Sequence, residues 1–187
     1  MKKFKGFSKK QILDIYGKMA LSRYLDDKQL ILLKQGKGFF HIGGSGHEAA
    51  GMAAALSFKP SFDYAYPYYR DQAFCLGWGM ESREHLLSFL AKKDDPSSGG
   101  RQMPQHYGHR ELNIVSQSSP TGTQFLQATG AGFALQRNGD NGVVYASSGE
   151  GTTSQGDFHE ALNWASRDKA PMIFHIENNG YAISVPI

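Results

Sequence analysis

The chain has 187 residues, one cysteine, and 20 Lys and Arg residues against 17 Asp and Glu, which gives a formal net charge of +3. This length suits one domain with its own core, and the small basic excess, with no basic stripe among aromatic residues, does not indicate nucleic-acid binding. The lone Cys75 cannot form an internal disulfide, and the sequence contains no secretory signal and no apolar run long enough to span a bilayer. We therefore expect a single domain over residues 1–187 in a reducing, cytoplasmic setting.

The first predicted element is a long helix from Ser8 to Gln35. Ser8 and Gln11 have the spacing of a capping box, and Gly36 marks the expected end of the helix. Its apolar stripe consists of Ile12, Ile15, Tyr16 and Met19. The basic residues before the helix, which we interpret as a solvated end, are Lys2, Lys3 and Lys5.

A glycine-rich passage over residues 36–46 leads into a helix that is predicted to begin near His47. The glycines that could approach a phosphate are Gly43, Gly44 and Gly46. A glycine cluster alone is weak evidence of a ligand site, so we favour a tight packing loop. We also interpret His41 and His47 as structural residues.

An aromatic turn from Asp63 to Asp71 contains Tyr69 and Arg70. The planar guanidinium of an arginine matches two phosphate oxygens at once. The alternative is a surface ion pair between Arg70 and Asp71.

A helix predicted over residues 82–92 is followed by a loop from Asp94 to Gly100 and by a polar stretch that contains His106. A histidine on a polar loop with a flexible hinge could act at a substrate gate, which makes His106 a substrate-side candidate. The alternative is an ordinary hydrogen-bonding histidine near the surface.

Ile114 and Val115 end a predicted short strand, and Pro120 begins a predicted helix that runs to Gln136. Glycine inside a helix costs about 1 kcal/mol relative to alanine, so we expect tight packing beside a cofactor cleft or a partner helix. The small residues of this segment are Gly122, Ala128, Gly130, Ala131, Gly132 and Ala134.

The stretch from Val143 to Ser184 organises the rest of the chain. The apolar runs 143–146 and 172–176 predict buried strands, and the amphipathic segment from Gln155 to Arg167 predicts a helix between them. Strand, helix and strand in this order form a parallel crossover unit. Ligands bind to such sheets beyond the carboxyl ends of the strands. Two polar clusters lie at those ends, Gly149–Gly151 and Asn178–Tyr181.

These clusters offer the hard oxygen ligands that Mg²⁺ prefers. Glu150 supplies a carboxylate, Asn179 an amide oxygen and Tyr181 a main-chain carbonyl. The glycines allow a phosphate to approach the backbone, and the helix that begins near Ser154 points its positive end there. Each cluster alone would be an ordinary turn, but their meeting at one sheet edge favours a metal and phosphate site.

The order and spacing of these clusters resemble the thiamine-diphosphate fingerprint, Gly-Asp-Gly followed after a helix by Asn-Asn. The words GEGTTSQGDFHEALNWAS, NNGYAIS and RQMPQHYG are similar to the alpha part of the decarboxylase (dehydrogenase) component of 2-oxo acid dehydrogenase complexes, with the branched-chain type closest. The resemblance covers the chain from about Leu21 to its end. Glu150 replaces the usual aspartate, as it does in the branched-chain members.

The resemblance implies an α/β fold with a mostly parallel sheet and helices on both faces. It implies oxidative decarboxylation of a 2-oxo acid, with a branched-chain acid favoured, and acyl transfer to lipoamide. The implied cofactors are thiamine diphosphate, Mg²⁺ and K⁺. The implied partners are a beta part, in a heterotetramer or a fused chain, and a lipoyl-bearing acyltransferase. Alternatives are a pyruvate- or acetoin-type thiamine enzyme and a non-catalytic module that keeps the fold.

The resemblance also implies that residues 1–187 are the front part of a longer alpha chain. The glutamate that activates the cofactor would lie in the second domain, so we expect no turnover by residues 1–187 alone.

Site residues follow from the same comparison of motifs. The expected cofactor-binding residues are Tyr69, Arg70, Ser119, Thr121, Gly149, Glu150, Gly151, Thr152, Asn179 and Tyr181. Those expected at Mg²⁺ are Glu150, Asn179 and Tyr181, and those expected at K⁺ are Ser118, Pro120, Thr123 and Gln124. Two positions depart from the branched-chain pattern. Thr121 replaces a larger apolar residue, and Glu177 replaces a diphosphate-binding arginine, which weakens the case for a strictly branched-chain substrate.

Overall fold

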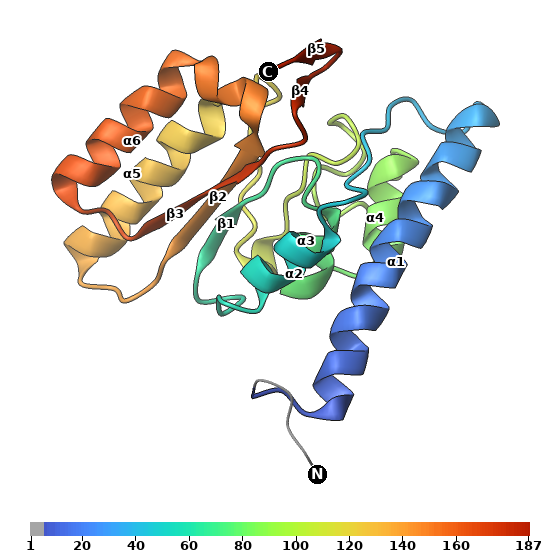
Figure 1. The fold of residues 1–187 in the computed structure, drawn as a ribbon, viewed down its shortest axis with the longest axis horizontal. Helices are drawn as coiled ribbons and strands as arrows, with labels where there is room; N and C mark the ends of the chain where they lie inside the picture. The colour runs from blue at the N-terminus through green and yellow to red at the C-terminus, as the bar shows by residue number, and fades with distance from the viewer. Residues whose placement is uncertain (1–5) are drawn as a thin grey trace.

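The computed structural model describes residues 6–187, so the predicted solvated end at Lys2, Lys3 and Lys5 lies outside the described residues. Its central element is a three-stranded parallel sheet in the order β1–β2–β3. Figure 1 shows the sheet between two groups of helices. The strands span Tyr64–Tyr66, Val144–Gly149 and Met172–Glu177.

Helices cover both faces of this sheet, as predicted for an α/β fold. Two helices, α5 and α6, lie on one face, and α2 and α3 lie on the other (Figure 1). Within residues 6–187, no helix combines the length and the apolar character that crossing a bilayer requires. The bounds of the four helices are Thr123–Asn138, Gly156–Asp168, Glu48–Ala55 and Gln72–Trp78.

The alternation of side chains along β2 produces two apolar cores. Val144 and Ala146 face α5 and pack with Phe125, while Tyr145 points the other way and stacks on Phe74 of α3 at 4.0 Å between ring centroids. All six residues of β2 are buried, because a central parallel strand is covered on both faces. Because the three strands run parallel, their carboxyl ends lie at one edge of the sheet.

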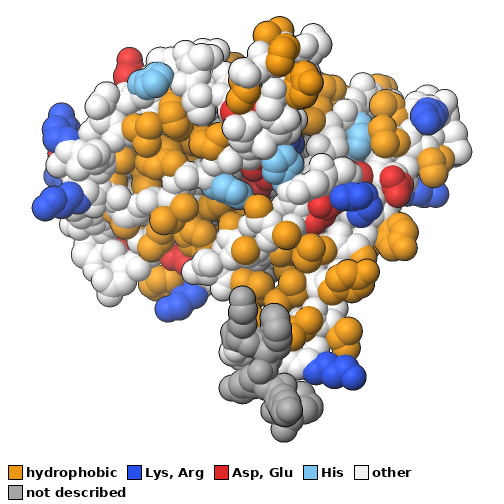
Figure 2. Space-filling view, viewed as in Figure 1, with side chains coloured by type: hydrophobic (Ala, Val, Ile, Leu, Met, Phe, Trp, Pro, Cys, Tyr) orange, Lys and Arg blue, Asp and Glu red, His pale blue; other side chains and the backbone are white. Residues whose placement is uncertain are grey.

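Helix α1 spans Lys9–Lys34 and begins with the predicted capping box. The backbone N–H of Ser8 donates to the side chain of Gln11 at 2.9 Å, and the Ser8 hydroxyl accepts from the Gln11 N–H at 3.3 Å. The predicted apolar stripe, however, does not enter the core. Tyr16 is 67% exposed, because the N-terminal half of α1 extends beyond the body of the protein (Figure 1). Figure 2 shows apolar side chains at the surface along this part of the protein. The residues of α1 that are buried are Ser22, Leu25, Asp26 and Gln29.

Several elements differ from the predicted boundaries. The helix expected from Pro120 begins only at Thr123, because Gly122 adopts a φ of +101°, and a 3-10 turn, η2, separates β2 from α6. The predicted aromatic turn begins with strand β1. The remaining elements are α4 (Ser82–Phe89), η1 (Arg110–Leu112), η2 (Glu150–Ser154), and the hairpin strands β4 (Tyr181–Ala182) and β5 (Val185–Pro186).

The small residues of α5 fall into two groups, one buried within the chain and one exposed or in open space. Ala128 and Gly132 are buried within the chain, and a Cβ on Gly132 would lie 3.1 Å from the Met172 side chain. Gly132 therefore packs against β3, and Ala128 belongs to the apolar core between α5 and the sheet. Ala134 is exposed, and a Cβ on Gly130 would meet no described atom within 4 Å, so these two positions alone keep the predicted partner interface open as a hypothesis.

Candidate functional site

Glu150 joins the two loops that leave β2 and β3. Gly149 and Glu177 are aligned in the parallel register, so both loops start at the same level of the sheet. One oxygen of the Glu150 carboxylate, Oε1, accepts hydrogen bonds from the backbone N–H groups of Tyr181 (2.8 Å) and Asn179 (3.2 Å). The structure therefore brings the three predicted magnesium ligands together.

The charge of Glu150 is stabilised by its surroundings. Burial opposes ionisation, but the backbone N–H groups of residue 150, Tyr181 and Asn179, and then the Arg70 charge, outweigh it and hold the pKa of Glu150 below its usual value. The second carboxylate oxygen, Oε2, is buried and accepts no hydrogen bond from residues 6–187. A buried carboxylate oxygen that accepts no hydrogen bond fits a cation ligand, because its desolvation is offset only by the Arg70 charge, 3.5 Å away.

Arg70 reaches the same edge from the loop after β1. Its Nη1 donates to the Glu177 carbonyl at 2.9 Å and lies 3.5 Å from Oε2 of Glu150. A Cβ on Gly149 would lie 2.9 Å from this Nη1, so a larger residue there would displace the guanidinium from its present position. The alternative of a surface pair with Asp71 is wrong, because Asp71 is 1% exposed and its carboxylate accepts hydrogen bonds from other groups.

Most of the predicted site residues line two neighbouring cavities. The larger, of about 230 Å³, is lined by Tyr68, Tyr69, Arg70, Thr121, Gly149, Gly151, Thr152 and the hairpin residues Tyr181, Ala182 and Ile183. The smaller, of about 20 Å³, is lined by Tyr68, Tyr69, Gln105, His106, Gln117, Ser118, Ser119, Pro120, Thr121 and Gln124. Tyr68, Tyr69 and Thr121 line both cavities, so the two form one continuous candidate site. Ser119 borders only the smaller cavity.

A cation at this site would depend on few charged ligands. In the part of the chain that the structure describes, no three His, Cys, Asp or Glu side chains come together as a metal-binding group. Glu150 would be the only carboxylate, beside the Asn179 amide and a backbone carbonyl. Such an oxygen set fits Mg²⁺, which commonly takes one or two carboxylates and completes its shell with phosphate and water.

The predicted potassium ligands are only partly assembled. The hydroxyl oxygens of Ser118 and Thr123 lie 2.5 Å apart, and Thr123 also donates to the Pro120 carbonyl at 3.0 Å. Gln124 is turned inward, where its amide oxygen accepts the Gly122 N–H at 3.0 Å. The structure thus brings Ser118, Pro120 and Thr123 together. Gln124 instead bonds the Gly122 backbone at the start of α5.

His106 lies on the wall of the smaller cavity, but its loop does not have the expected flexible hinge. The Asp95 carboxylate accepts hydrogen bonds from the backbone N–H groups of Ser97, Ser98 and Gly100. A Cβ on Gly100 would lie 2.5 Å from the Ala91 carbonyl oxygen. The segment before His106 is therefore a closely bonded turn.

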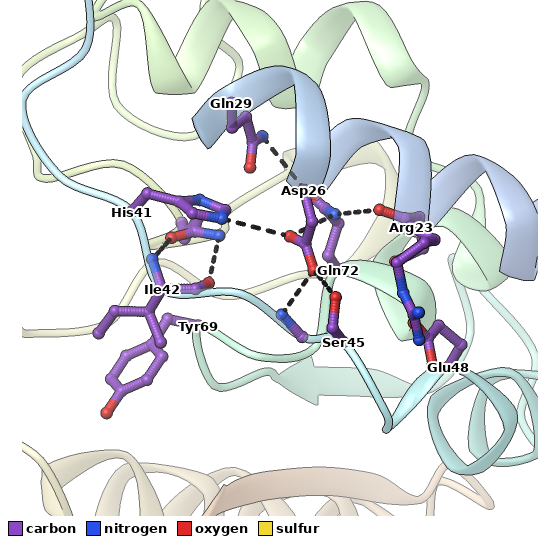
Figure 3. A network of polar contacts seen from close by, with 12 residues as sticks. Arg23, Asp26, Gln29, His41, Ile42, Ser45, Glu48, Tyr69 and Gln72 are labelled. Carbon is purple, nitrogen blue, oxygen red and sulfur yellow. Dashed lines mark hydrogen bonds and ion pairs between the residues drawn. The ribbon is translucent and has the colours of Figure 1, made fainter. Parts of the chain in front are cut away.

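The glycine-rich loop is a packing loop, as favoured from the sequence. The Gly44 N–H and the Ser45 hydroxyl both donate to the Asp26 carboxylate at 3.0 Å, so these donors are not free for a phosphate. Figure 3 shows Asp26 between His41 and Ser45 of this loop, with 3.6 Å between the Asp26 carboxylate and His41 Nε2. Burial lowers the pKa of His41, which suits a neutral structural histidine.

A buried polar cluster behind Arg70 was not predicted. Asp71 accepts a hydrogen bond from the Tyr145 hydroxyl at 3.0 Å, and that hydroxyl lies 2.7 Å from His175 Nδ1. Burial, and then the neighbouring Asp71, raise the pKa of Glu177 to about 10. The raised pKa favours the neutral form of Glu177, which leaves the positive charge of Arg70 intact. A carboxyl residue at the end of an apolar run was the sequence signal for this burial.

The fold and the site define an α/β protein with an anion- and cation-compatible site at the carboxyl edge of a parallel sheet. Residues 16–187 match the protein family described as dehydrogenase E1 component. The chain belongs to this family.

Curated relatives show which members of this family the chain is similar to. The chain is 42% identical over 181 residues to the 2-oxoisovalerate dehydrogenase subunit alpha of Bacillus subtilis (strain 168), which covers 97% of this chain and 55% of that protein. It is 37% identical over 180 residues to the mitochondrial 2-oxoisovalerate dehydrogenase subunit alpha 1 of Arabidopsis thaliana, covering 96% and 38%. It is 35% identical over 176 residues to the pyruvate dehydrogenase E1 component subunit alpha of Staphylococcus aureus (strain MW2), covering 94% and 45%. The chain thus spans about half, or less, of the length of these relatives.

Proposed function

We propose that this chain is the alpha part of a thiamine-diphosphate-dependent 2-oxo acid dehydrogenase. The observation that carries the proposal is the Glu150 carboxylate, which gathers the Asn179 and Tyr181 loop through one oxygen and keeps the other without a hydrogen bond from the described residues. This arrangement, at the carboxyl edge of a parallel sheet, fits a magnesium-bound diphosphate.

Each side chain of the site has a distinct task in this proposal. Glu150 and Asn179, with the carbonyl of Tyr181, would hold Mg²⁺, while Arg70 and Tyr69 would bind the diphosphate oxygens. When bound, thiamine diphosphate supplies the carbon nucleophile and the electron sink for decarboxylation.

The substrate is proposed to be a 2-oxo acid, with a branched-chain acid favoured. The 42% identity to a 2-oxoisovalerate dehydrogenase alpha subunit supports this choice. The 35% identity to a pyruvate dehydrogenase alpha subunit and the presence of Glu177 keep pyruvate as a second candidate. The acyl group would pass to lipoamide on an acyltransferase partner, and a beta part would complete the active site.

Calorimetric titration of the full-length protein with thiamine diphosphate and Mg²⁺ tests the cofactor assignment. We expect saturable binding that requires Mg²⁺ and is abolished in Glu150→Ala, because the site has only one carboxylate. Glu160→Ala, which removes an exposed carboxylate on α6, is the matched control and should bind as the parent does. Unchanged binding by Glu150→Ala would show that the site is elsewhere.

Two activity measurements test the reaction. A panel of branched-chain 2-oxo acids, pyruvate and acetoin, assayed with lipoamide and the full-length protein, should give the highest kcat/KM for a branched-chain acid. Preference for pyruvate would select the second candidate. Residues 1–187 alone are proposed to be inactive because the beta part is needed, and robust turnover by that fragment would contradict this requirement.

A further inference from the structure

Gln105 joins two loops that lie 63 residues apart in the sequence. Its side-chain amide accepts a hydrogen bond from the Ile42 N–H at 2.8 Å and donates one to the Ile42 carbonyl at 2.7 Å. Gln105 is 3% exposed. Because loss of either bond would leave a buried polar group without a partner, the amide is held in one orientation.

The backbone at Gln105 also directs the residue that follows it. Gln105 has a φ of +66°, a left-handed conformation that disfavours L residues. The next residue, His106, is half-buried, whereas Pro104 and Tyr107 on either side of this pair are buried. The turn at Gln105 therefore sets the direction in which the His106 side chain leaves the loop.

A second tertiary contact holds the loop beyond His106. The Tyr107 hydroxyl donates to the Tyr69 carbonyl at 3.3 Å. His106 thus lies between two fixed points, and it lines the smaller cavity together with Tyr69 and Thr121. Its Nδ1 lies 3.2 Å from the Pro104 carbonyl, and because a carbonyl only accepts, Nδ1 carries a proton in this contact. Nε2 is then the ring atom left for a ligand.

The loop that Gln105 holds is itself anchored to the longest helix. Asp26 of α1 accepts hydrogen bonds from Gly44 and Ser45, two and three residues beyond Ile42. Figure 3 shows Asp26 together with Ile42 and Ser45 of this loop. The tie from Gln105 therefore reaches helix α1 through residues 42–45.

We propose that Gln105 is a positioning residue, which fixes the His106 imidazole at the wall of the smaller cavity, where it would contact the carboxylate or keto group of the 2-oxo acid. The identity of that ligand rests on the proposed function. The placement of His106 by Gln105 does not, because it follows from the paired hydrogen bonds and the turn.

Gln105→Met in the full-length protein removes both hydrogen bonds while keeping the length of the side chain. Gln102→Met is the matched control, because Gln102 lies in the same loop and, among the described residues, its side chain makes one hydrogen bond, to the Gln117 carbonyl at 3.2 Å. We would follow the modification of His106 by diethyl pyrocarbonate with mass spectrometry of its peptide. Melting temperature, thiamine diphosphate affinity, kcat and KM would be measured on the same samples.

For Gln105→Met we expect His106 to be modified at least about threefold faster and KM to rise about tenfold, in keeping with the loss of two buried hydrogen bonds. Thiamine diphosphate affinity should stay within about twofold of the parent, because Arg70 is held by the Glu177 carbonyl and not by Ile42. Gln102→Met should match the parent in His106 reactivity and in KM.

Gln105→Glu gives a second readout that simple loss of stability would not reproduce. The carboxylate keeps the acceptor for the Ile42 N–H but places a second oxygen against the Ile42 carbonyl, where the amide donor now lies at 2.7 Å. Protonation of the introduced carboxylate restores a donor. The rise in KM and in His106 reactivity of Gln105→Glu over the parent should therefore be smaller at about pH 6 than at about pH 8, whereas that of Gln105→Met should not depend on pH in this way.

The proposal is wrong if both Gln105 variants remain folded and neither changes His106 reactivity more than Gln102→Met does. If the parent protein turns over no 2-oxo acid, the proposed function fails instead. In that case the relative modification rates of His106 still decide whether Gln105 positions this side chain.

Discussion

Replacing Gly44 with alanine is expected to destabilise the protein by about 1–3 kcal/mol, the usual penalty for forcing atoms into filled space. The added Cβ would lie 2.4 Å from the carbonyl oxygen of Arg70, well inside van der Waals contact. Since the obstacle is backbone, no side-chain rotation relieves the clash. The loop cannot easily retreat either, because the Gly44 N–H is bonded to Asp26 at 3.0 Å.

Gly17→Ala is the matched control, because this exposed helical glycine of α1 would place its Cβ where no described atom lies within 4 Å. Alanine there should stabilise the protein by about 1 kcal/mol. At about 2–4 °C per kcal/mol for a domain of this size, scanning calorimetry of the full-length protein should show a lower midpoint for Gly44→Ala and a higher one for Gly17→Ala. A midpoint for Gly44→Ala equal to or above that of the parent would refute the packing argument.

Three further predictions concern the site and acid stability. Glu150→Asp should bind thiamine diphosphate and Mg²⁺ more weakly than the parent but more tightly than Glu150→Ala, because it keeps a carboxylate, and titration calorimetry checks this order. Arg70→Lys should weaken cofactor affinity about tenfold, since an ammonium cannot make a two-pronged contact, whereas parent-like affinity in Arg70→Ala would remove Arg70 from the site. Burial lowers the pKa of His85 from 6.5 to about 4, so its contribution to stability is complete above pH 6.5 and declines as the pH falls toward 4. This loss amounts to ~3 kcal/mol, and the denaturant-unfolding free energies of the parent and His85→Leu at about pH 7 and about pH 4.5 should show a smaller acid effect in the variant.

Local sequence rules predicted the elements whose signals are contained in a few neighbouring residues. The capping box of Ser8 and Gln11, the strands at residues 143–146 and 172–176, and the meeting of Glu150 with Asn179 all followed from spacing and from the geometry of a parallel crossover. Strand β1 was missed because three residues are too few to show a period of two.

Long-range contacts were beyond such rules. Nothing in the local sequence distinguishes Gln105, which pairs with Ile42, from Gln102, which does not. The apolar residues at the start of α1 predicted a buried face, yet burial depends on where a straight helix meets the body of the protein. The alternative that Arg70 pairs with the adjacent Asp71 was also a local one, whereas the fold turns Asp71 inward to Tyr145.

The register between β2 and β3 has a consequence for how sequences of this kind can change length. Gly149 and Glu177 are paired, so the loops that carry Glu150 and Asn179 begin at the same level of the sheet. This level depends on the lengths of β2 and β3 and not on the length of the helix between them. Residues added near Lys169, in the turn at the opposite edge of the sheet, would leave both loops level. One residue added inside β3 would shift the pairing and turn each following side chain to the other face. Insertions and deletions should therefore be tolerated at the amino edge of this sheet and rejected within its strands.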